Sequence, residues 1–327
     1  MKSRWSSIVL AVLLTSPFAV LGFHAPLGAA QPDSLQVGGA SVGGAFYVLA
    51  GGVAKVLEEK LRIPVTAAVT EGSLENVRLL DRKQVDLAVV AANNAYPAYH
   101  GVLGFDKKHA FLRAIVGFYP NAFAFMSLPG TPYKSFTSLK GQRVGVGTGK
   151  TWDMFMRPLF RGHGMEYGRD FKPVYAGLGD LFTQLGDRAI VAAPGVVSGG
   201  SPIPGAMQLA AEKGAQYFGP DPAAAKKAIQ ELPFMSAIRI AKDTPSFDRS
   251  IETVDIGGPS LYVRAEMADD LVYRITKLLH ENWGQLAKDI LYFKYAQSHP
   301  ERLTMDNGVP YHSGAIRYWK ETGLWKR

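Results

Sequence analysis

The sequence predicts an α/β protein in which one pattern of alternating strands and helices occurs twice along the chain. Two glycine-rich segments, Gly38–Ala45 and Gly147–Thr151, each follow a short apolar run and precede a segment with helical periodicity. The run Val85–Ala92 is continuously apolar rather than alternating, which is typical of a strand covered on both faces of a parallel sheet. These observations indicate repeated strand–turn–helix units around buried sheets.

The first unit combines a strand over Leu35–Val37 with a helix that begins close to Gly43. Glycines let a backbone approach a ligand closely, and the first turn of a helix leaves N–H groups unpaired near a partial positive charge. The turn is therefore a candidate anion site. A connection that binds nothing is the open alternative.

Two further units complete the first set. A strand at Ile63–Val69 precedes a helix through about Asp81, with Ser73 and Asn76 at its N-terminus. The third strand ends at Asn93-Asn94. Ligands of open α/β sheets bind beyond the carboxyl ends of the strands, so these polar residues are expected to share one edge.

The rest of the chain continues the alternation and closes with helices. The strands at 253–256 and 260–264 are expected to return to the first set. The other strands are predicted at 111–118, 121–128, 143–146, 172–175, 189–193, 215–218 and 235–240, and the other helices at 152–163, 178–185, 204–213, 222–231, 266–286, 288–298 and 316–322.

Residues 1–30 have the pattern of a secretory signal peptide. Lys2 and Arg4 precede an apolar run over 8–21, and small residues follow at 28–30, so cleavage is predicted after Ala30. An uncleaved anchor is the alternative, but the run is shorter than the roughly 20 residues that a membrane span needs. The chain contains no cysteine, which excludes a lipid anchor, disulfides and thiolate metal sites. We therefore expect a periplasmic protein.

Composition places the chain among globular proteins of about two domains, with 327 residues of which 47% are hydrophobic and 20% charged. The formal net charge of +8 becomes +6 once Lys2 and Arg4 are removed, because 1–30 contains no acidic residue. The sequence has no run of basic residues typical of a nucleic-acid site, and the modest surplus would not repel an anion.

Catalytic and metal motifs are weak. Gly39–Gly43 matches the Gly-x-Ser-x-Gly elbow, so a secreted serine hydrolase using Ser41, with His312 as a distant base, stays an alternative, although the elbow would fall on the first strand. Val144–Thr151 lacks one glycine of a phosphate-binding loop. The seven histidines show no metal spacing, so we expect neither metal nor cofactor.

Several ordered motifs together resemble a known family. Val37–Tyr47 followed by Thr70–Asn76 resembles the extracytoplasmic solute-binding subunits of tripartite (TRAP) transporters, in their TAXI branch. Matches continue over nearly the whole mature chain, at Val144–Val146 with Thr151, Gly199–Pro202, Leu271–Lys277 and Val309–Tyr318.

The resemblance implies a type II periplasmic-binding-protein fold, in which two α/β lobes are joined by hinge strands and the ligand lies in the cleft between them. We expect the first lobe at 31–120 plus 252–327 and the second at 121–251. Such a protein binds a small organic anion (a dicarboxylate, a 2-oxoacid or a glutamate-like acid) as a monomer and hands it to TRAP membrane permease subunits, without catalysis. A membrane sensor as client remains an alternative.

The resemblance also implies which residues contact the ligand. From one lobe these are Ser41, Gly43, Gly44, Tyr47, Ser73, Asn76, Asn93 and Asn94, and from the other Gly147, Thr148, Lys150, Thr151, Ser198 and Gly199.

Two departures from the family pattern bear on specificity. The chain has Asn93-Asn94 where the family commonly has a Ser-Asp pair, and Lys150 where it has a small residue. Losing a carboxylate removes a partner for a substrate ammonium, and gaining lysine adds a cation. The hypothesis is a preference for a di- or polyanionic acid without an amino group, and the alternative is that Lys150 points to solvent.

Overall fold

The computed structural model describes residues 32–326. The predicted signal peptide over 1–30 lies outside these residues. Within 32–326, no helix combines the length and the apolar character that crossing a membrane requires.

The first lobe is built on a five-stranded sheet in which one late strand lies among four early ones. Its order is β2 (Val65–Ala68), β1 (Leu35–Gly38), β3 (Leu87–Ala91), β15 (Pro259–Arg264) and β4 (Leu112–Gly117). β1 pairs in parallel with β2 and β3, so their carboxyl ends share one edge of the sheet. β15 pairs antiparallel with both β3 and β4.

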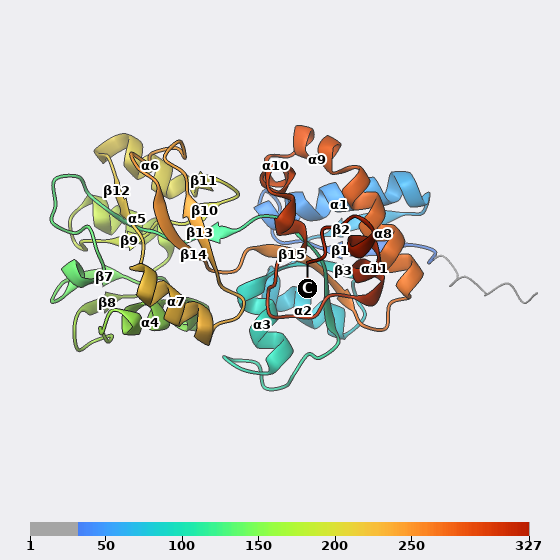
Figure 1. Ribbon diagram of the computed structural model, residues 1–327, viewed down its shortest axis with the longest axis horizontal. Coiled ribbons are helices and arrows are strands. Elements are labelled where there is room, and N and C mark those ends of the chain that lie inside the picture. Colours follow the sequence, from blue (N-terminus) through green and yellow to red (C-terminus); the bar gives the residue numbers. More distant parts are fainter. Residues whose placement is uncertain (1–31, 327) are drawn as a thin grey trace, which may run out of the picture. The chain divides into compact units, whose positions relative to one another are not determined.

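Helices cover this sheet because each presents an apolar face to it. On α1 (Ala45–Leu61), Leu49, Val53 and Leu57 are fully buried at helical spacing. Figure 1 shows α1 and the C-terminal helices grouped around β1, β2, β3 and β15. The other helices of this lobe are α2 (Ser73–Asp81), α3 (Ala92–His100), α8 (Asp269–Glu281), α9 (Trp283–Asp289), α10 (Leu291–Ser298), the 3-10 helix η2 (Pro300–Thr304) and α11 (Ser313–Glu321).

The second lobe divides its strands among three smaller sheets. The largest is antiparallel, in the order β11 (Ser201–Pro202), β10 (Val197–Ser198), β5 (Asn121–Ala122), β14 (Ile251–Asp255) and β13 (Ser236–Ile240). The others are β12 (Gln216–Phe218), β6 (Phe125–Ser127) and β9 (Ala193–Pro194), and the parallel pair β7 (Arg143–Gly145) and β8 (Lys172–Val174). The helices are η1 (Thr137–Leu139), α4 (Gly149–Gly162), α5 (Leu178–Gly186), α6 (Pro204–Lys213) and α7 (Pro222–Glu231).

Two segments cross between the lobes side by side. Phe118–Pro120 joins β4 to β5, and Ile256–Gly258 joins β14 to β15. A Cβ at Gly258 would lie 1.8 Å from the carbonyl oxygen of Tyr119, so only glycine fits this approach. The buried Asp255 carboxylate ties both segments together, because its Oδ1 accepts the backbone N–H of Asn121 and of Gly257, each at 3.0 Å.

These features confirm the predicted α/β fold with two lobes, and the first sheet agrees with the type II periplasmic-binding-protein fold. The limits of α6 and α7 match their predictions of 204–213 and 222–231. The prediction that 253–256 returns to the first set is wrong, because β14 pairs with β13 and β5 in the second lobe. The strand at 260–264 does return, as β15.

Several other boundaries differ from prediction. The strand predicted at 121–128 is interrupted, and β5 and β6 belong to different sheets. The predicted helix at 266–286 divides at Asn282 into α8 and α9. Most of the strand predicted at 189–193 is irregular, since β9 begins only at Ala193.

Candidate functional site

A cavity of about 340 Å³ lies where α3 and α4 begin, beyond the carboxyl ends of β3 and β7. This volume is within the usual range for small-molecule sites, roughly 300–1,000 Å³. It is lined from the first lobe by Leu74, Asn93, Asn94, Pro97, Leu103, Gly104 and Phe105, and from the second by Gly149, Lys150, Thr151 and Met154.

Two carboxamides form the polar part of the first-lobe wall. β3 passes into α3 without a loop, and the backbone N–H of Ala92 donates to Gly258 O, which fixes the start of the helix. Asn94 Nδ2 donates to Asn93 Oδ1 at 2.8 Å. Among residues 32–326 neither side chain makes another hydrogen bond. The amide N–H₂ group of Asn93 and the amide oxygen of Asn94 are therefore available to a ligand.

The second-lobe wall is the first turn of α4. Gly147 turns the chain into this helix with a φ of +75°, and a Cβ there would meet the Trp152 ring at 2.4 Å, so glycine is required. No side chain caps the helix. Lys150 is exposed, and within the described part of the chain its ammonium group has no ion pair. The cavity therefore meets a free cation at the positive end of a helix.

The other predicted contacts from the first glycine-rich turn do not line this cavity. Ser41, Val42 and Gly43 are exposed in a tight turn closed by the Gly44 N–H bond to Ser41 O at 3.0 Å, with a Gly43 φ of +85°. Tyr47 is half-buried within α1. This turn precedes α1 as predicted, but its side chains are not gathered with those of Asn93, Asn94, Lys150 and Thr151.

Ser73 and Asn76 are engaged inside the first lobe. Asn76 is fully buried, and its Nδ2 donates to Gly39 O at 2.7 Å and to Val89 O at 2.8 Å, which links the ends of β1 and β3. Ser73 Oγ accepts the Ala91 N–H at 3.1 Å. These two predicted contacts hold the edge of the sheet in place and are not cavity-lining residues.

The remaining predicted residues of the second lobe also lie outside the cavity. Gly147 is buried against Trp152, and Thr148 is the exposed N-cap residue of α4. Ser198 Oγ donates to Asn121 Oδ1 at 2.8 Å, and Gly199 lies against the ring of Tyr119. Ser198 and Gly199 therefore support the crossing between the lobes.

The sequence prediction missed the apolar part of the wall. Leu74, Pro97, Leu103, Phe105 and Met154 line the cavity. Met154 could have been found from its i, i+4 relation to Lys150 on one helix, and Pro97 from the same relation to Asn93. Leu103 and Phe105 belong to a loop after α3, and no periodic signal marks them.

Three other hollows in the described part of the chain are weaker candidates for a ligand site. A groove of about 470 Å³ beside α7 exposes mainly apolar surface but is also lined by Lys226 and Glu252, and one of about 240 Å³ lies between α5 and α6. A third, of about 310 Å³, adjoins the cavity along α4, where Arg157 and Arg161 are already paired with Asp153 and Glu231. Of these four hollows among residues 32–326, the cavity at α3 and α4 is the one that combines unpaired polar groups from both lobes.

Catalytic chemistry at Ser41 finds no support in this geometry. Among residues 32–326 the Ser41 hydroxyl makes no hydrogen bond. His312 is buried at the start of α11, where its Nδ1 accepts the Gly314 N–H at 3.2 Å. Within the same residues, no cluster of three or more acidic or histidine side chains has the geometry to hold a metal ion.

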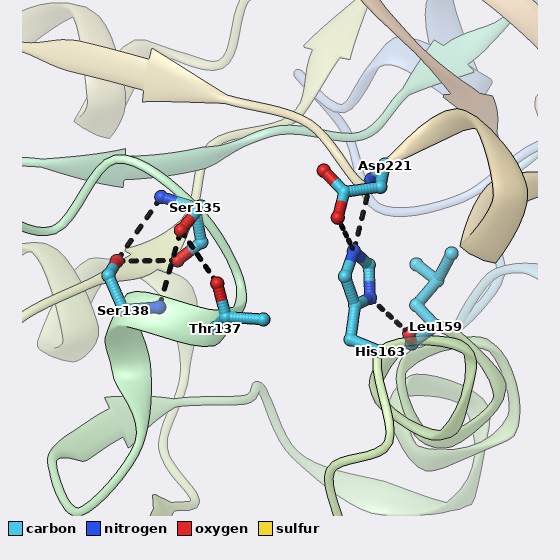
Figure 2. Close-up of polar contacts among 6 residues, drawn as sticks. All are labelled: Ser135, Thr137, Ser138, Leu159, His163 and Asp221. Carbon is cyan, nitrogen blue, oxygen red and sulfur yellow. Dashed lines mark hydrogen bonds and ion pairs between the residues drawn. The ribbon is translucent and has the colours of Figure 1, made fainter.

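His163 illustrates how a buried histidine is used structurally (Figure 2). Its Nδ1 lies 2.8 Å from Leu159 O, and its Nε2 accepts the Asp221 N–H at 3.0 Å, so the ring is neutral and joins the end of α4 to the start of α7. Burial lowers its pKa, with the Leu159 carbonyl and Asp221 opposing the shift. Ser135 and Ser138 in the same figure bond each other across the start of η1.

Comparison with known proteins gives one family match and several distant structural likenesses. The NMT1-like family matches residues 37–323. The periplasmic aliphatic sulphonate binding protein SsuA from Escherichia coli aligns with 13% identity over 90% of this chain and 80% of its own, at a TM-score of 0.44. A putative SsuA from Methylobacillus flagellatus aligns with 11% identity over 89% and 87%, at 0.49. XAC2383 from Xanthomonas citri, bound to ATP, aligns with 11% identity over 90% and 97%, also at 0.49.

Proposed function

The chain belongs to the NMT1-like family, and on that premise we propose that it is an extracytoplasmic solute-binding protein that captures a small organic anion at the start of α3 and α4. One observation carries this proposal. Polar groups from both lobes, Asn93 and Asn94 from one and Lys150 and Thr151 from the other, line a single cavity without being used by the fold.

The charges of the cavity favour an anion that has no ammonium group. Lys150 is the only charged side chain that lines it among the described residues, and no carboxylate does. An ammonium group held there would lose its hydration without gaining a counter-ion, which is costly. A carboxylate or sulfonate head would pair with Lys150 and accept hydrogen bonds from Thr151 and the Asn amides.

The proposed mechanism is closure of the two lobes about the crossing segments. Because β14 (Ile251–Asp255) pairs within the second lobe, we propose that the first lobe comprises 31–120 plus 256–327 and the second 121–255, rather than 252–327 and 121–251 as expected from the sequence. A ligand held by Asn93 and Asn94 would gain contacts with Lys150 and Thr151 as the lobes approach. Because it makes more contacts in the closed state than in the open state, it stabilises the closed state. The closed form would then be what a membrane partner recognises.

The membrane partner proposed from the sequence resemblance is a TRAP permease of the TAXI type. Delivery to a permease requires a location outside the cytoplasm, which the predicted signal peptide supports. Reconstitution of the permease encoded beside this chain, with transport measured with and without the protein, tests this partner. Transport that depends on an ABC-type permease, or a sensor kinase as the neighbouring gene, would contradict the TRAP assignment and leave the binding function intact.

Ligand capture is tested with Lys150→Ala. Mass spectrometry of what co-purifies, followed by calorimetric titration against a panel of organic acids, identifies the anion. We expect Lys150→Ala to weaken its binding by at least tenfold, about 1.4 kcal/mol, without lowering the melting temperature. Lys172→Ala, an exposed lysine of β8 in the same lobe, is the matched control. Unchanged affinity in Lys150→Ala would remove Lys150 from the site.

A further inference from the structure

We infer that the ligand is a monoanion with an apolar arm, a carboxylate or sulfonate head carrying a chain of about six carbons. This inference rests on the proposed function and narrows its ligand class. It replaces the expectation of a di- or polyanion that the sequence favoured. Its basis is the division of the cavity wall into a small cationic end and a larger apolar part.

The polar groups suffice for one acidic head and no more. Lys150 supplies one positive charge, and Asn93, Asn94 and Thr151 supply neutral donors and acceptors. The next cation along α4, Arg157, is already bonded to Asp153 at 3.0 Å and stacks over the Tyr167 ring at 4.3 Å. A second carboxylate in the cavity would therefore be desolvated without a counter-ion.

Apolar side chains make up the rest of the wall. Two of them are leucines that are much more exposed to solvent than most other leucines of this lobe. Leu74 is 46% and Leu103 is 47% exposed, although the neighbouring core offers burial to most leucines of this lobe. Both line the cavity, together with Pro97, Phe105 and Met154. Exposed apolar side chains gathered at a cavity mark a surface that a ligand covers.

The backbone of Leu103 adds a second observation at this part of the wall. Its φ is +57°, in the left-handed region that bulky residues avoid. Backbone strain of this kind clusters at ligand clamps, and here it holds an apolar side chain at the cavity rim next to Lys150, whose side chain lies beside Gly104. Asparagine tolerates this conformation better than leucine, so the position can be made polar without adding strain.

The size of the cavity sets the length of the arm. A volume of about 340 Å³ corresponds to roughly eleven groups of water size at about 30 Å³ each. A carboxylate or sulfonate head takes three or four of these places by this estimate, and the seven or eight that remain are enough for an arm of about six carbons. Each methylene buried against the apolar wall should tighten binding about fourfold.

The experiment is calorimetric titration of the purified protein with acetate, butyrate, hexanoate, hexanesulfonate, succinate and adipate. We expect affinity to rise about fourfold per methylene from butyrate to hexanoate. We also expect adipate, which has the length of hexanoate and a second carboxylate, to bind at least tenfold more weakly. The comparison of hexanoate with hexanesulfonate identifies the head group.

The variant Leu103→Asn, with Leu103→Met as its matched control, tests whether the apolar arm of the ligand contacts this wall. The asparagine variant should bind hexanoate about tenfold more weakly while its affinity for acetate changes less than twofold. A flat chain-length series, or adipate that binds as tightly as hexanoate, would overturn the inference and leave the proposed function standing. Failure of every anion to bind would instead overturn the proposed function.

Discussion

The crossing between the lobes and the cavity at α3 and α4 both bring polar groups together, but they use them in opposite ways. At the crossing, the Asp255 carboxylate is fully buried and accepts two backbone N–H groups, and Arg302 Nη1 lies 3.7 Å from its Oδ2. At the cavity, the ammonium group of Lys150 has no ion pair within residues 32–326.

This difference separates structural polar groups from groups kept for a ligand. A buried polar group stabilises a fold only when its hydrogen bonds are satisfied inside it. A half-exposed group with spare donors and acceptors does little for stability and stays available for binding. Asp255 Oδ1, Asn76 Nδ2 and the His163 ring are bonded within the fold, whereas the side chains of Asn93, Asn94 and Lys150 are the groups that we propose for the ligand.

The largest effect is expected from Asp255→Ala. This change removes the acceptor shared by the Asn121 and Gly257 N–H groups and leaves Arg302, whose side chain is 15% exposed, without its counter-ion. Removing one partner of a buried pair costs about 3–5 kcal/mol of unfolding free energy. Urea denaturation measures it.

Asp255→Asn is the control for this prediction. Its Oδ1 can still accept both N–H groups, so the loss should be smaller than in Asp255→Ala. Burial raises the pKa of the Asp255 carboxyl to about 6, although Arg302 opposes the shift, so ionisation costs stability as pH rises through this range. The deficit of Asp255→Asn relative to the native protein should therefore be smaller at pH 7 than at pH 5. If Asp255→Ala lowered the free energy of unfolding by less than about 1 kcal/mol, the polar groups at the crossing would stabilise the fold no more than those of the cavity, and the contrast drawn above would be wrong.

Asn76→Ala comes next. It deprives the carbonyls of Gly39 and Val89 of a side-chain donor in a fully buried position. Gly39 O keeps the hydroxyl of Thr70 as a donor at 3.1 Å, so the loss of the two Asn76 bonds should lower the free energy of unfolding by about 1–3 kcal/mol. Anion affinity should change little because Asn76 does not line the cavity. Denaturation and calorimetry on the same variant measure both quantities. A variant with native stability and weakened binding would restore Asn76 as the ligand contact that the sequence favoured.

The fold was predictable from the sequence where local signals and tertiary structure agree. The helix at Ser73–Asp81 was found because polar residues mark its start and apolar residues recur along it. The helix α3 was missed because Asn93-Asn94 and Pro97 disfavour a helix, and it forms where the Ala92 N–H bonds to Gly258 O, more than 160 residues away.

The site was predictable only in part for the same reason. Asn93, Asn94, Lys150 and Thr151 follow strands and could be named from the motif pattern. Whether Ser73 and Asn76 face a ligand or the fold depends on hydrogen-bond partners that the sequence does not display. The apolar wall comes from α2, from the loop after α3 and from α4, which are brought together only by the three-dimensional structure.

A smaller effect, dependent on pH, is expected at His163. Because burial lowers the pKa of this imidazole below its ordinary 6.5, the unfolded chain takes up the proton first as pH falls. The stability that the neutral ring contributes is complete above about pH 6.5 and declines below it. Replacement by glutamine should cost about 1 kcal/mol at pH 7.5, the worth of one hydrogen bond, and should reduce the slope of stability against pH between 7 and 5.

Chemical denaturation at several pH values measures this slope. Burial also lowers the pKa of His109, His280 and His312, so part of the slope persists in the variant. An unchanged slope in His163→Gln would show that His163 does not couple folding to protonation. Anion binding by this variant should equal that of the native protein, because the ring joins α4 to α7 away from the cavity.

The smallest effect is expected from Ser41→Ala. This variant tests whether the first glycine-rich turn contributes to the stability of the fold or to ligand binding. The turn is closed by backbone, through the Gly44 N–H bond to Ser41 O, and the exposed hydroxyl has no partner among residues 32–326. Stability should change by less than about 0.5 kcal/mol, as for exposed positions in general. Anion affinity should change less than twofold, and an active-site serine reagent should not label the protein. A tenfold loss of affinity with native stability would bring Ser41 into the ligand's contacts after closure, whereas labelling at Ser41 would revive the hydrolase alternative.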